Sequence, residues 1–381
     1  MHTHFELVSL AVQAQFSCPS APAVILVGQA GVGKNKGGVE PLAKALSKNL
    51  VWLPTPRYES ADFNGYPAPD FESGTMRFLA PQWAQKIADD DPSNYVVFLD
   101  EVADGDSRTQ AALHGVVQDG FVADLNLSTA AFILAMNPPE IATTGGCTSH
   151  PITNRSLIVW WEPSRNDVSK MMRAGKWELP EVTLLPENWT LGISASMSLV
   201  GQFLTLFPQH LRITPEELME RGENIWHPAH TDRSWEHFWI LRAAALASGQ
   251  KHLLADIARG TVGAPGNEFL AWERDLNLGD PEDYLKNPKG LPLPEEDDRA
   301  FALANMVVQA AVSNNTPDRW NAAWSFLAYM KDNQMGDIAA VNAPILARNR
   351  GKAKGVPADA KPFIPLLQAA GIIKSHVGGE K

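Results

Sequence analysis

Four short apolar runs, each followed by a polar residue or a glycine, constrain the fold of this chain more than any other feature. They comprise residues 23–27, 95–99, 130–136 and 156–161. Between the second and third run, Leu113, Val116 and Val117 recur at helical spacing. Uninterrupted apolar strands separated by helices are typical of a parallel sheet that is covered on both faces. Ligands of such sheets bind beyond the carboxyl ends of the strands.

The second half of the chain has mostly helical patterns. Trp235, Phe238 and Trp239 follow a helical period, and Thr316 followed by Pro317 is a good helix start. Residues 287–294 are rich in proline and predict a break between helices. We therefore expect a sheet domain up to about Glu162, followed by helices.

Composition and charge exclude several classes of function. Of 381 residues, 32 are Lys or Arg and 43 are Asp or Glu, which gives a formal charge of −11. Phosphate backbones are held by clustered basic residues, so we do not expect nucleic acid as a partner. The two cysteines exclude a disulfide framework and a cysteine-based zinc site. No apolar run approaches the ~20 residues that span a bilayer, and no signal peptide is recognised at the start. We expect a soluble cytoplasmic protein that does not contact membranes.

A glycine-rich loop with a lysine follows the first apolar run directly. Residues 28–34 read Gly-Gln-Ala-Gly-Val-Gly-Lys, which fits G-x-x-x-x-G-K. Glycines let backbone N–H groups converge on phosphate oxygens, and Lys34 would neutralise the outer phosphates. A plain turn between strand and helix is the alternative, but strand context, spacing and lysine favour phosphate. The expected nucleotide-binding residues are Gly28, Gly31, Val32, Gly33, Lys34 and Asn35.

The residues after this lysine depart from the usual pattern. Asn35 stands where Ser or Thr usually ligates magnesium, and its larger amide can ligate a hard cation only with a different geometry. Gly37, Gly38 and Pro41 lie where the phosphate-binding helix should run. In a helix interior a glycine costs ~1 kcal/mol and a proline ~3 kcal/mol relative to alanine. We predict that the helix is broken and restarts at Pro41, which would weaken phosphate binding.

The next two strand ends carry residues suited to hydrolysis. Asp100 and Glu101 follow the second run, where the first acid would hold magnesium and the second would polarise the attacking water. Asn137 ends the third run and could hydrogen-bond that water or the terminal phosphate. A solvated acidic turn and an Asn-Pro turn are the alternatives.

Two arginines complete the set of candidates. Arg155 precedes the fourth run, where it could stabilise charge on the nucleotide of a neighbouring subunit, or could be an ordinary surface residue. Arg233 lies at the start of a helix that Thr231 or Asp232 caps, as a phosphate sensor or an exposed first-turn residue. Other side chains are weaker candidates for a functional site. His227 and His230 flank a proline without the spacing of a metal site. Cys147 is predicted to be a loop thiol. We expect most of the twelve tryptophans in the core.

Together these motifs resemble those of the AAA+ ATPases, and within them the MoxR-like group. The resemblance runs through residues 21–28, 62–67, 98–101, 110–113, 135–139, 154–155 and 233–236. The order and spacing of the set are specific, whereas each piece alone is not. The resemblance implies an α/β fold, with a P-loop AAA+ parallel sheet core that has helices on both faces and is followed by a mostly helical lid and C-terminal region. It implies a nucleotide-binding domain over residues 1–165, a linker and lid over 166–285, and a helical extension over 286–381.

The resemblance also implies a role for each motif. Residues 28–34 are similar to Walker A, Asp100 and Glu101 to Walker B, and Asn137 to sensor 1. Arg155 is similar to an arginine finger, although Ser156 follows where phenylalanine is usual, and Arg233 is similar to sensor 2. Residues 62–78 resemble an inserted element near the pore face of a ring.

The implied cofactors are ATP and Mg²⁺, with Asp100 and Asn35 as the metal ligands. The implied assembly is a homo-oligomer, usually a hexameric ring, and the implied partner is a protein that often contains a von Willebrand A domain.

The function implied is that of an ATP-dependent AAA+ ring ATPase, a chaperone that remodels or assembles a protein partner. The alternative is a nucleotide-binding scaffold module that is weakly active or inactive, because of Asn35 and the disrupted helix. A nucleic-acid motor is a third reading, which the acidic charge disfavours.

Overall fold

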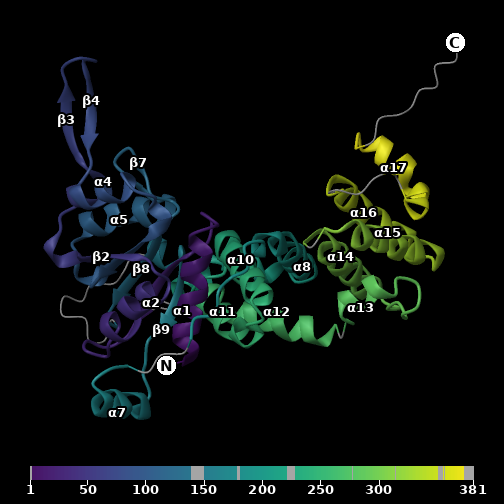
Figure 1. The fold of residues 1–381 in the computed structure, drawn as a ribbon, viewed down its shortest axis with the longest axis horizontal. Coiled ribbons are helices and arrows are strands. Elements are labelled where there is room, and N and C mark those ends of the chain that lie inside the picture. The colour runs from purple at the N-terminus through teal and green to yellow at the C-terminus, as the bar shows by residue number, and fades with distance from the viewer. Residues whose placement is uncertain are drawn as a thin grey trace. The chain divides into compact units, whose positions relative to one another are not determined.

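The structure is a computed structural model that describes residues 2–138, 150–177, 181–220, 228–276, 278–313, 315–350, 355 and 357–372 (Figure 1). The chain packs as two compact units. Unit 1 comprises Met1–Thr190 and Phe207–Glu268, and unit 2 comprises Leu191–Leu206 and Phe269–Lys381. The three-part division at residues 165 and 285 stays a prediction.

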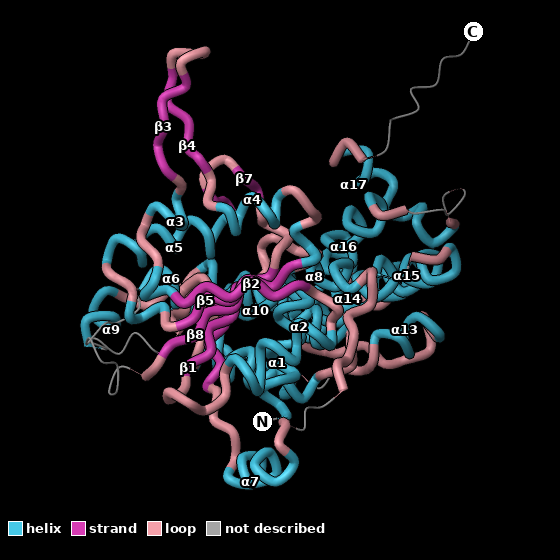
Figure 2. Tube along the Cα trace, turned by 60° about the vertical axis from the view of Figure 1, so that its left-hand side comes forward, coloured by secondary structure: helices cyan, strands magenta, loops and turns pink. Residues whose placement is uncertain are grey.

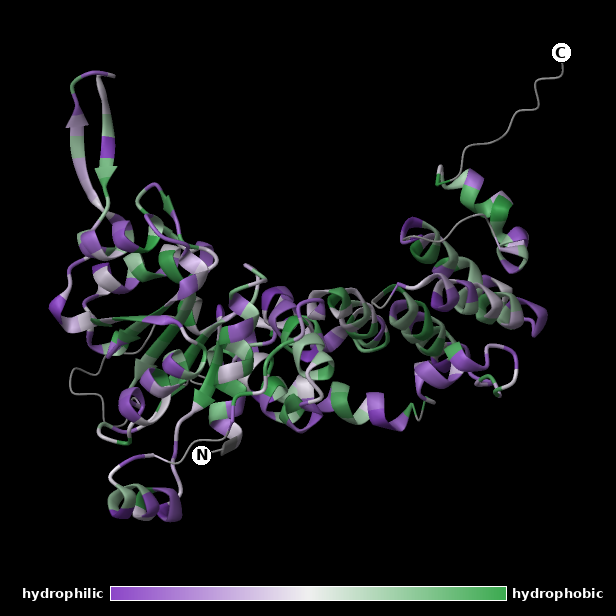
Figure 3. Cartoon of the chain, viewed as in Figure 1, coloured by the Kyte–Doolittle hydropathy of each residue, from purple (hydrophilic) through white to green (hydrophobic). Residues whose placement is uncertain are grey.

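Unit 1 is built around a parallel sheet, which has five strands in the described part of the chain. They are β1 (Ala23–Val27), β2 (Asn49–Pro54), β5 (Tyr95–Asp100), β8 (Ala131–Met136) and β9 (Ser156–Trp160). Their order is β2-β5-β8-β1-β9, so the strand that precedes the glycine-rich loop lies between β8 and β9. Every residue of β1 and β8 is buried, and Figure 3 shows apolar residues concentrated in these strands. The predicted α/β fold with a parallel sheet core is confirmed, and its assignment to the P-loop AAA+ class stays a prediction.

Helices cover both faces of the sheet, as Figure 2 shows for α1 (His2–Gln15) and α5 (Ser107–Asp119). Leu113 and Val116 of α5 pack in one core with Ile25 and Val27 of β1. On the other face, α1 contacts β1, β8 and β9. The remaining helices that begin in unit 1 are α2 (Glu40–Ala45), α3 (Ala61–Asn64), α4 (Gln82–Ala88), α6 (His150–Thr153), α7 (Arg165–Ala174), α9 (Pro215–Glu220), α10 (Asp232–Ala247), α11 (Leu254–Thr261) and α12 (Ala264–Asp275).

Two small hairpins extend from this core. β6 (Phe121–Val122) pairs with β7 (Leu125–Asn126), and β3 (Tyr66–Asp70) pairs antiparallel with β4 (Thr75–Leu79). The β3–β4 hairpin projects away from the sheet in Figures 1 and 2. Its turn residue Phe71 is 91% exposed, and Met76 is 60% exposed. This hairpin makes up most of the predicted insertion at residues 62–78, and its place in a ring stays a prediction.

The described residues of unit 2 form helices and the loops that connect them. Its helices are α8 (Ile193–Leu206), α13 (Pro281–Lys286), α14 (Asp297–Ser313), α15 (Pro317–Asp332), α16 (Gly336–Arg348) and α17 (Ile364–Ala369). Thr316 caps α15 as predicted, because its hydroxyl accepts a hydrogen bond from the Arg319 N–H. No described helix combines the length and apolar character needed to cross a bilayer.

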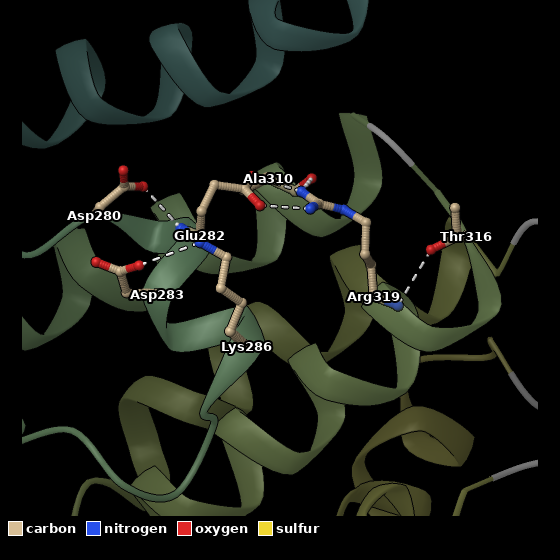
Figure 4. A network of polar contacts seen from close by, with 7 residues as sticks. All are labelled: Asp280, Glu282, Asp283, Lys286, Ala310, Thr316 and Arg319. Carbon is tan, nitrogen blue, oxygen red and sulfur yellow. Dashed lines mark hydrogen bonds and ion pairs between the residues drawn. The ribbon is translucent and has the colours of Figure 1, made fainter.

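A charged network ties three helices of unit 2 together (Figure 4). Arg319 of α15 donates both terminal nitrogens to the Glu282 carboxylate of α13, and one of them also donates to the Ala310 carbonyl of α14 at 2.7 Å. Asp280 caps α13 by accepting from the Glu282 N–H. The Arg319 guanidinium lowers the pKa of Glu282, so the pair stays ionised. We assign this network to structure, since the Arg319 terminal nitrogens bond to two other helices of the bundle.

Candidate functional site

The glycine-rich loop leaves the carboxyl end of β1 between two neighbouring strands. The Gly28 N–H donates to the Met136 carbonyl at 3.2 Å, and a Cβ at Gly28 would lie 2.6 Å from the Trp161 carbonyl oxygen. Gly31 and Gly33 have φ values of +80° and +86°, which residues with a Cβ rarely adopt. The loop therefore needs glycine at these three positions for its path alone.

Lys34 joins this loop to the end of β8. Its ammonium lies 3.2 Å from Asn137 Oδ1 and 3.2 Å from the Met136 carbonyl oxygen, and it also donates to Gly28 O and Gln29 O. Burial lowers the pKa of Lys34, while the charges of Asp100 and Glu101 oppose this shift. Lys34 and Asn137, which are far apart in sequence, thus meet as predicted.

The acidic pair lies at the end of β5. Burial raises the pKa of Asp100, against the hydrogen bond from Trp52 Nε1 at 3.2 Å and the positive charge of Lys34. Glu101 is exposed and left-handed, with φ 57° and ψ 42°, a conformation that costs a non-glycine residue on the order of 1–3 kcal/mol. This strained turn separates the two carboxylates into a half-buried one beside Lys34 and a solvent-facing one.

The helix after the loop differs from the prediction of a break. Residues Asn35–Val39 form a π-helix that runs directly into α2. The Val39 N–H donates to the Lys34 carbonyl at 3.1 Å, a bond that closes the wider π turn. Pro41 lies in the first turn of α2, as predicted. The glycines therefore widen the helix here and do not interrupt it.

Two tryptophans explain the glycines in this π-helix. A Cβ at Gly38 would lie 2.8 Å from the ring of Trp161, which is 1% exposed. A Cβ at Gly37 would lie 2.7 Å from Trp177 Nε1, and one at Gly33 would lie 2.8 Å from the same ring. The missing side chains make room for two indoles that lie directly on the helix backbone.

Sequence reasoning did not identify these aromatic contacts. Most tryptophans were expected in the core, where Trp161 lies; Trp52 is an exception, because it is 50% exposed and bonds to Asp100. The one available signal was the pair of glycines at Gly37 and Gly38, since a glycine in a helix often marks a close approach of another group.

The residues present fit a hard cation. Asn35 Oδ1 is buried and has no hydrogen-bond partner, and a buried orphan oxygen costs about 1–3 kcal/mol unless something binds it. Asp100 supplies a carboxylate at the same end of the sheet. Oxygen ligands of these two kinds suit Mg²⁺. No group of three or more His, Cys, Asp or Glu suited to a metal occurs among the described residues.

Arg155 and Arg233 lie at the amino ends of the strands, on the side of the sheet opposite to the glycine-rich loop. Ser156 pairs with Ala23 at the amino end of β1, so Arg155 lies about 20 Å from Gly28 at ~3.3 Å per strand residue. Asn154 Nδ2 donates to Thr231 Oγ1 at 3.1 Å, which brings the start of α10 to the same place. Burial and the charge of Arg233 lower the pKa of Arg155, and the charges of both arginines add to the lowering of the His237 pKa by burial. The structure brings these two arginines together and does not bring them to Lys34.

Three residues named from sequence lie outside the described part of the chain. They are Pro139, Cys147 and His227.

Comparison with known proteins adds little to this geometry. No protein-family model matches the sequence. A search of curated proteins finds no match either. One solved structure, of a Cytophaga hutchinsonii protein described provisionally as an ATPase, aligns with 15% sequence identity and a TM-score of 0.39. The alignment covers 68% of this chain and 83% of that chain. A TM-score this low does not establish a common fold, and the fold described above is defined by strand order and pairing.

Proposed function

We propose that this chain is an ATPase of the AAA+ type. One observation carries the proposal. The Lys34 ammonium lies 3.2 Å from Asn137 Oδ1 and within electrostatic range of Asp100 and Glu101, so three strand ends of one parallel sheet converge on a glycine-rich loop. This is the set of groups that binds a triphosphate and directs water at its terminal phosphorus.

Each residue of the set has a distinct task. The backbone N–H groups of the loop hold phosphate oxygens, and Lys34 exchanges its carbonyl acceptors for the outer phosphate oxygens. Phosphate charge beside the ammonium favours its protonated form and offsets the lowering of its pKa by burial. Asn137 positions the attacking water, and Glu101 accepts a proton from it.

Asp100 and Asn35 would hold Mg²⁺ in this proposal. The bound ion supplies charge neutralisation between the outer phosphates. Asn35 would then pair its buried orphan oxygen, and the cation would add to Trp52 and Lys34 in opposing the rise of the Asp100 pKa that burial causes.

Arg155 and Arg233 would act on the nucleotide of a neighbouring subunit. Arg155 is about 20 Å from the loop of its own chain along the strands, which is too far for its side chain to reach, and the Asn154–Thr231 hydrogen bond brings the start of the Arg233 helix to the same end of the sheet. A homo-oligomeric ring, hexameric in the usual form of this class, would place this edge against the next site. The sequence likeness to the MoxR-like group supports a chaperone that remodels a protein partner, including one with a von Willebrand A domain.

The second candidate is a nucleotide-binding scaffold with weak or no turnover. It is favoured by Asn35 in place of a hydroxyl and by the π-helix at residues Asn35–Val39.

One experiment separates the two candidates. Magnesium-ATP binding and turnover are measured for the wild type, Lys34→Ala and Glu101→Gln, with the exposed Lys44→Ala as a matched loss of positive charge. The ATPase proposal expects wild-type turnover, loss of binding in Lys34→Ala, and binding without turnover in Glu101→Gln. Binding without wild-type turnover supports the scaffold, and absence of binding by the wild type contradicts both.

A further inference from the structure

We propose that Trp177 is the base-binding wall of the nucleotide site, on which the base of a purine nucleotide stacks. The inference rests on the proposed function and goes beyond it, because none of the loop, acid or amide motifs says what holds the nucleoside.

The placement of the Trp177 ring carries the inference. Its six-membered ring lies 2.8 Å from an ideal Cβ on Gly33, and its Nε1 lies 2.7 Å from one on Gly37. These two glycines flank Lys34, so the indole lies on the backbone of the first helical turn after the loop. An alanine at either position would displace the ring.

The ring also lies at the end of the loop where a nucleoside is expected. The Lys34 ammonium points to Asn137, which marks the side of the outer phosphates. The inner phosphate is held by the loop backbone at the start of the helix. Whatever is attached to the inner phosphate therefore leaves beside Gly33 and Gly37, where the indole lies.

Trp177 is not explained by core packing. It is only half-buried, and the preceding helix α7 (Arg165–Ala174) has no buried residue. The segment that begins with α7 thus contacts the sheet core again where Trp177 places its ring on the loop backbone. Base–aromatic stacking needs such a ring with part of its surface open.

The test compares a ligand that has a base with one that has none. Binding of magnesium-ATP and of magnesium-tripolyphosphate is measured by calorimetry for the wild type, Trp177→Ala and Trp177→Phe, with Trp239→Phe as a control on the half-buried Trp239. We expect the ATP dissociation constant of Trp177→Ala to rise on the order of tenfold or more, while its tripolyphosphate constant stays within about twofold. Trp177→Phe should retain most of the ATP affinity. ATP should quench wild-type tryptophan fluorescence, and this quench should persist in Trp239→Phe but be lost in Trp177→Phe.

Three results would overturn the inference while leaving the proposed function standing. Equal weakening of both ligands in Trp177→Ala would make the ring a support of the loop. Tighter binding of both ligands in Trp177→Ala would mean that the indole blocks the phosphate site and must move when phosphates bind. Unchanged binding of both would place the base elsewhere. Failure of the wild type to bind either ligand would remove the proposed function and this inference with it.

Discussion

Burial shifts the pKa of single side chains at both ends of the strands of the sheet. At the carboxyl edge it lowers the pKa of Lys34 and raises that of Asp100, and each group opposes the shift of the other. Both shifts disfavour charge in the nucleotide-free chain. A phosphate bound beside Lys34 would raise its pKa, and a cation bound beside Asp100 would lower that of Asp100. The two shifts therefore favour the binding of an anion together with a cation, as in magnesium-ATP.

His237 makes the free energy of unfolding depend on pH. Burial lowers its pKa to about 3, and the charges of Arg233 and Arg155 add to the shift. Below pH ~6.5 the unfolded chain binds a proton that the folded chain does not, so stability falls from there toward pH 3. At pH 5 the loss from this group is about 2 kcal/mol. His237→Gln should remove most of it, as urea unfolding at pH 7 and pH 5 would measure.

The same replacement at the exposed His252 is the control for this prediction. It should leave the loss of stability between pH 7 and pH 5 close to that of the wild type. An unchanged pH dependence in His237→Gln would show that other groups cause the acid sensitivity.

Asn35 should determine the response to magnesium. In Asn35→Ala the orphan oxygen is gone, and we expect the Mg²⁺ concentration for half-maximal ATP binding to rise about tenfold, the effect of ~1.4 kcal/mol. Asn35→Thr, which restores a hydroxyl ligand, should stay near or below the wild-type value. Titration of Mg²⁺ at fixed ATP measures this, and a wild-type response in Asn35→Ala would remove Asn35 from the metal site.

Among the elements, the π-helix at Asn35–Val39 shows how packing outweighs propensity. Two glycines would destabilise an ordinary helix by ~1 kcal/mol each. Here they admit the rings of Trp161 and Trp177, and the widened turn accommodates that contact. The loss of helix propensity can be read from Gly37 and Gly38 themselves. The contacts that offset it are made by tryptophans more than 120 positions away in the chain.

Two alanine substitutions should therefore have opposite signs. Gly38→Ala would place its methyl 2.8 Å from the ring of buried Trp161, and overpacking of this kind costs about 1–3 kcal/mol. Gly115→Ala lies on the exposed face of α5 with nothing within 4 Å, so it should stabilise by about 0.4–1 kcal/mol. Urea unfolding of the two variants measures both. Stabilisation by Gly38→Ala would mean that Trp161 moves freely.

These elements also show what could be predicted from the sequence. Four of the five strands of the sheet could be, because a strand buried on both faces reads as a continuous apolar run, as in residues Ala23–Val27. The fifth, β2, was not predicted; it lies at the side of the sheet, and of its residues only Leu53 is buried. The places of Lys34, Asp100 and Asn137 could be predicted, because Asp100 ends such a strand, Asn137 directly follows one, and Lys34 closes the glycine-rich loop that follows a third. The indoles on the loop could not, since no local pattern records which distant ring lies against a glycine. Nor could the edge position of Arg233, which depends on how α10 docks beside Asn154.

For the whole molecule, the separation of the arginines from their own loop predicts complementation between subunits. On the proposed function, a Lys34→Ala subunit cannot bind nucleotide but still offers Arg155 to its neighbour. An Arg155→Ala subunit binds nucleotide but offers no arginine to its neighbour. Each variant alone should show little turnover, whereas a mixture should recover a measurable fraction, because some interfaces combine an intact site with an intact arginine. Turnover of the mixed variants measures this, with each variant mixed with itself as control. Absence of any recovery would assign the arginines to a structural role.

Unit 2 is not contiguous in sequence, and this bears on how the protein can be divided. The chain enters it for α8, leaves it after Leu206 and returns at Phe269. Within it, Phe203 of α8 packs edge-to-face on Phe269 at 5.5 Å and lies beside Trp272. A single backbone cleavage before Phe269 would leave α8 on the wrong fragment and strip these rings of their neighbours. To separate unit 2 intact, the chain would have to be cut on both sides of α8 and again before Phe269, and the two segments rejoined. We therefore expect unit 1 and unit 2 to be inherited together.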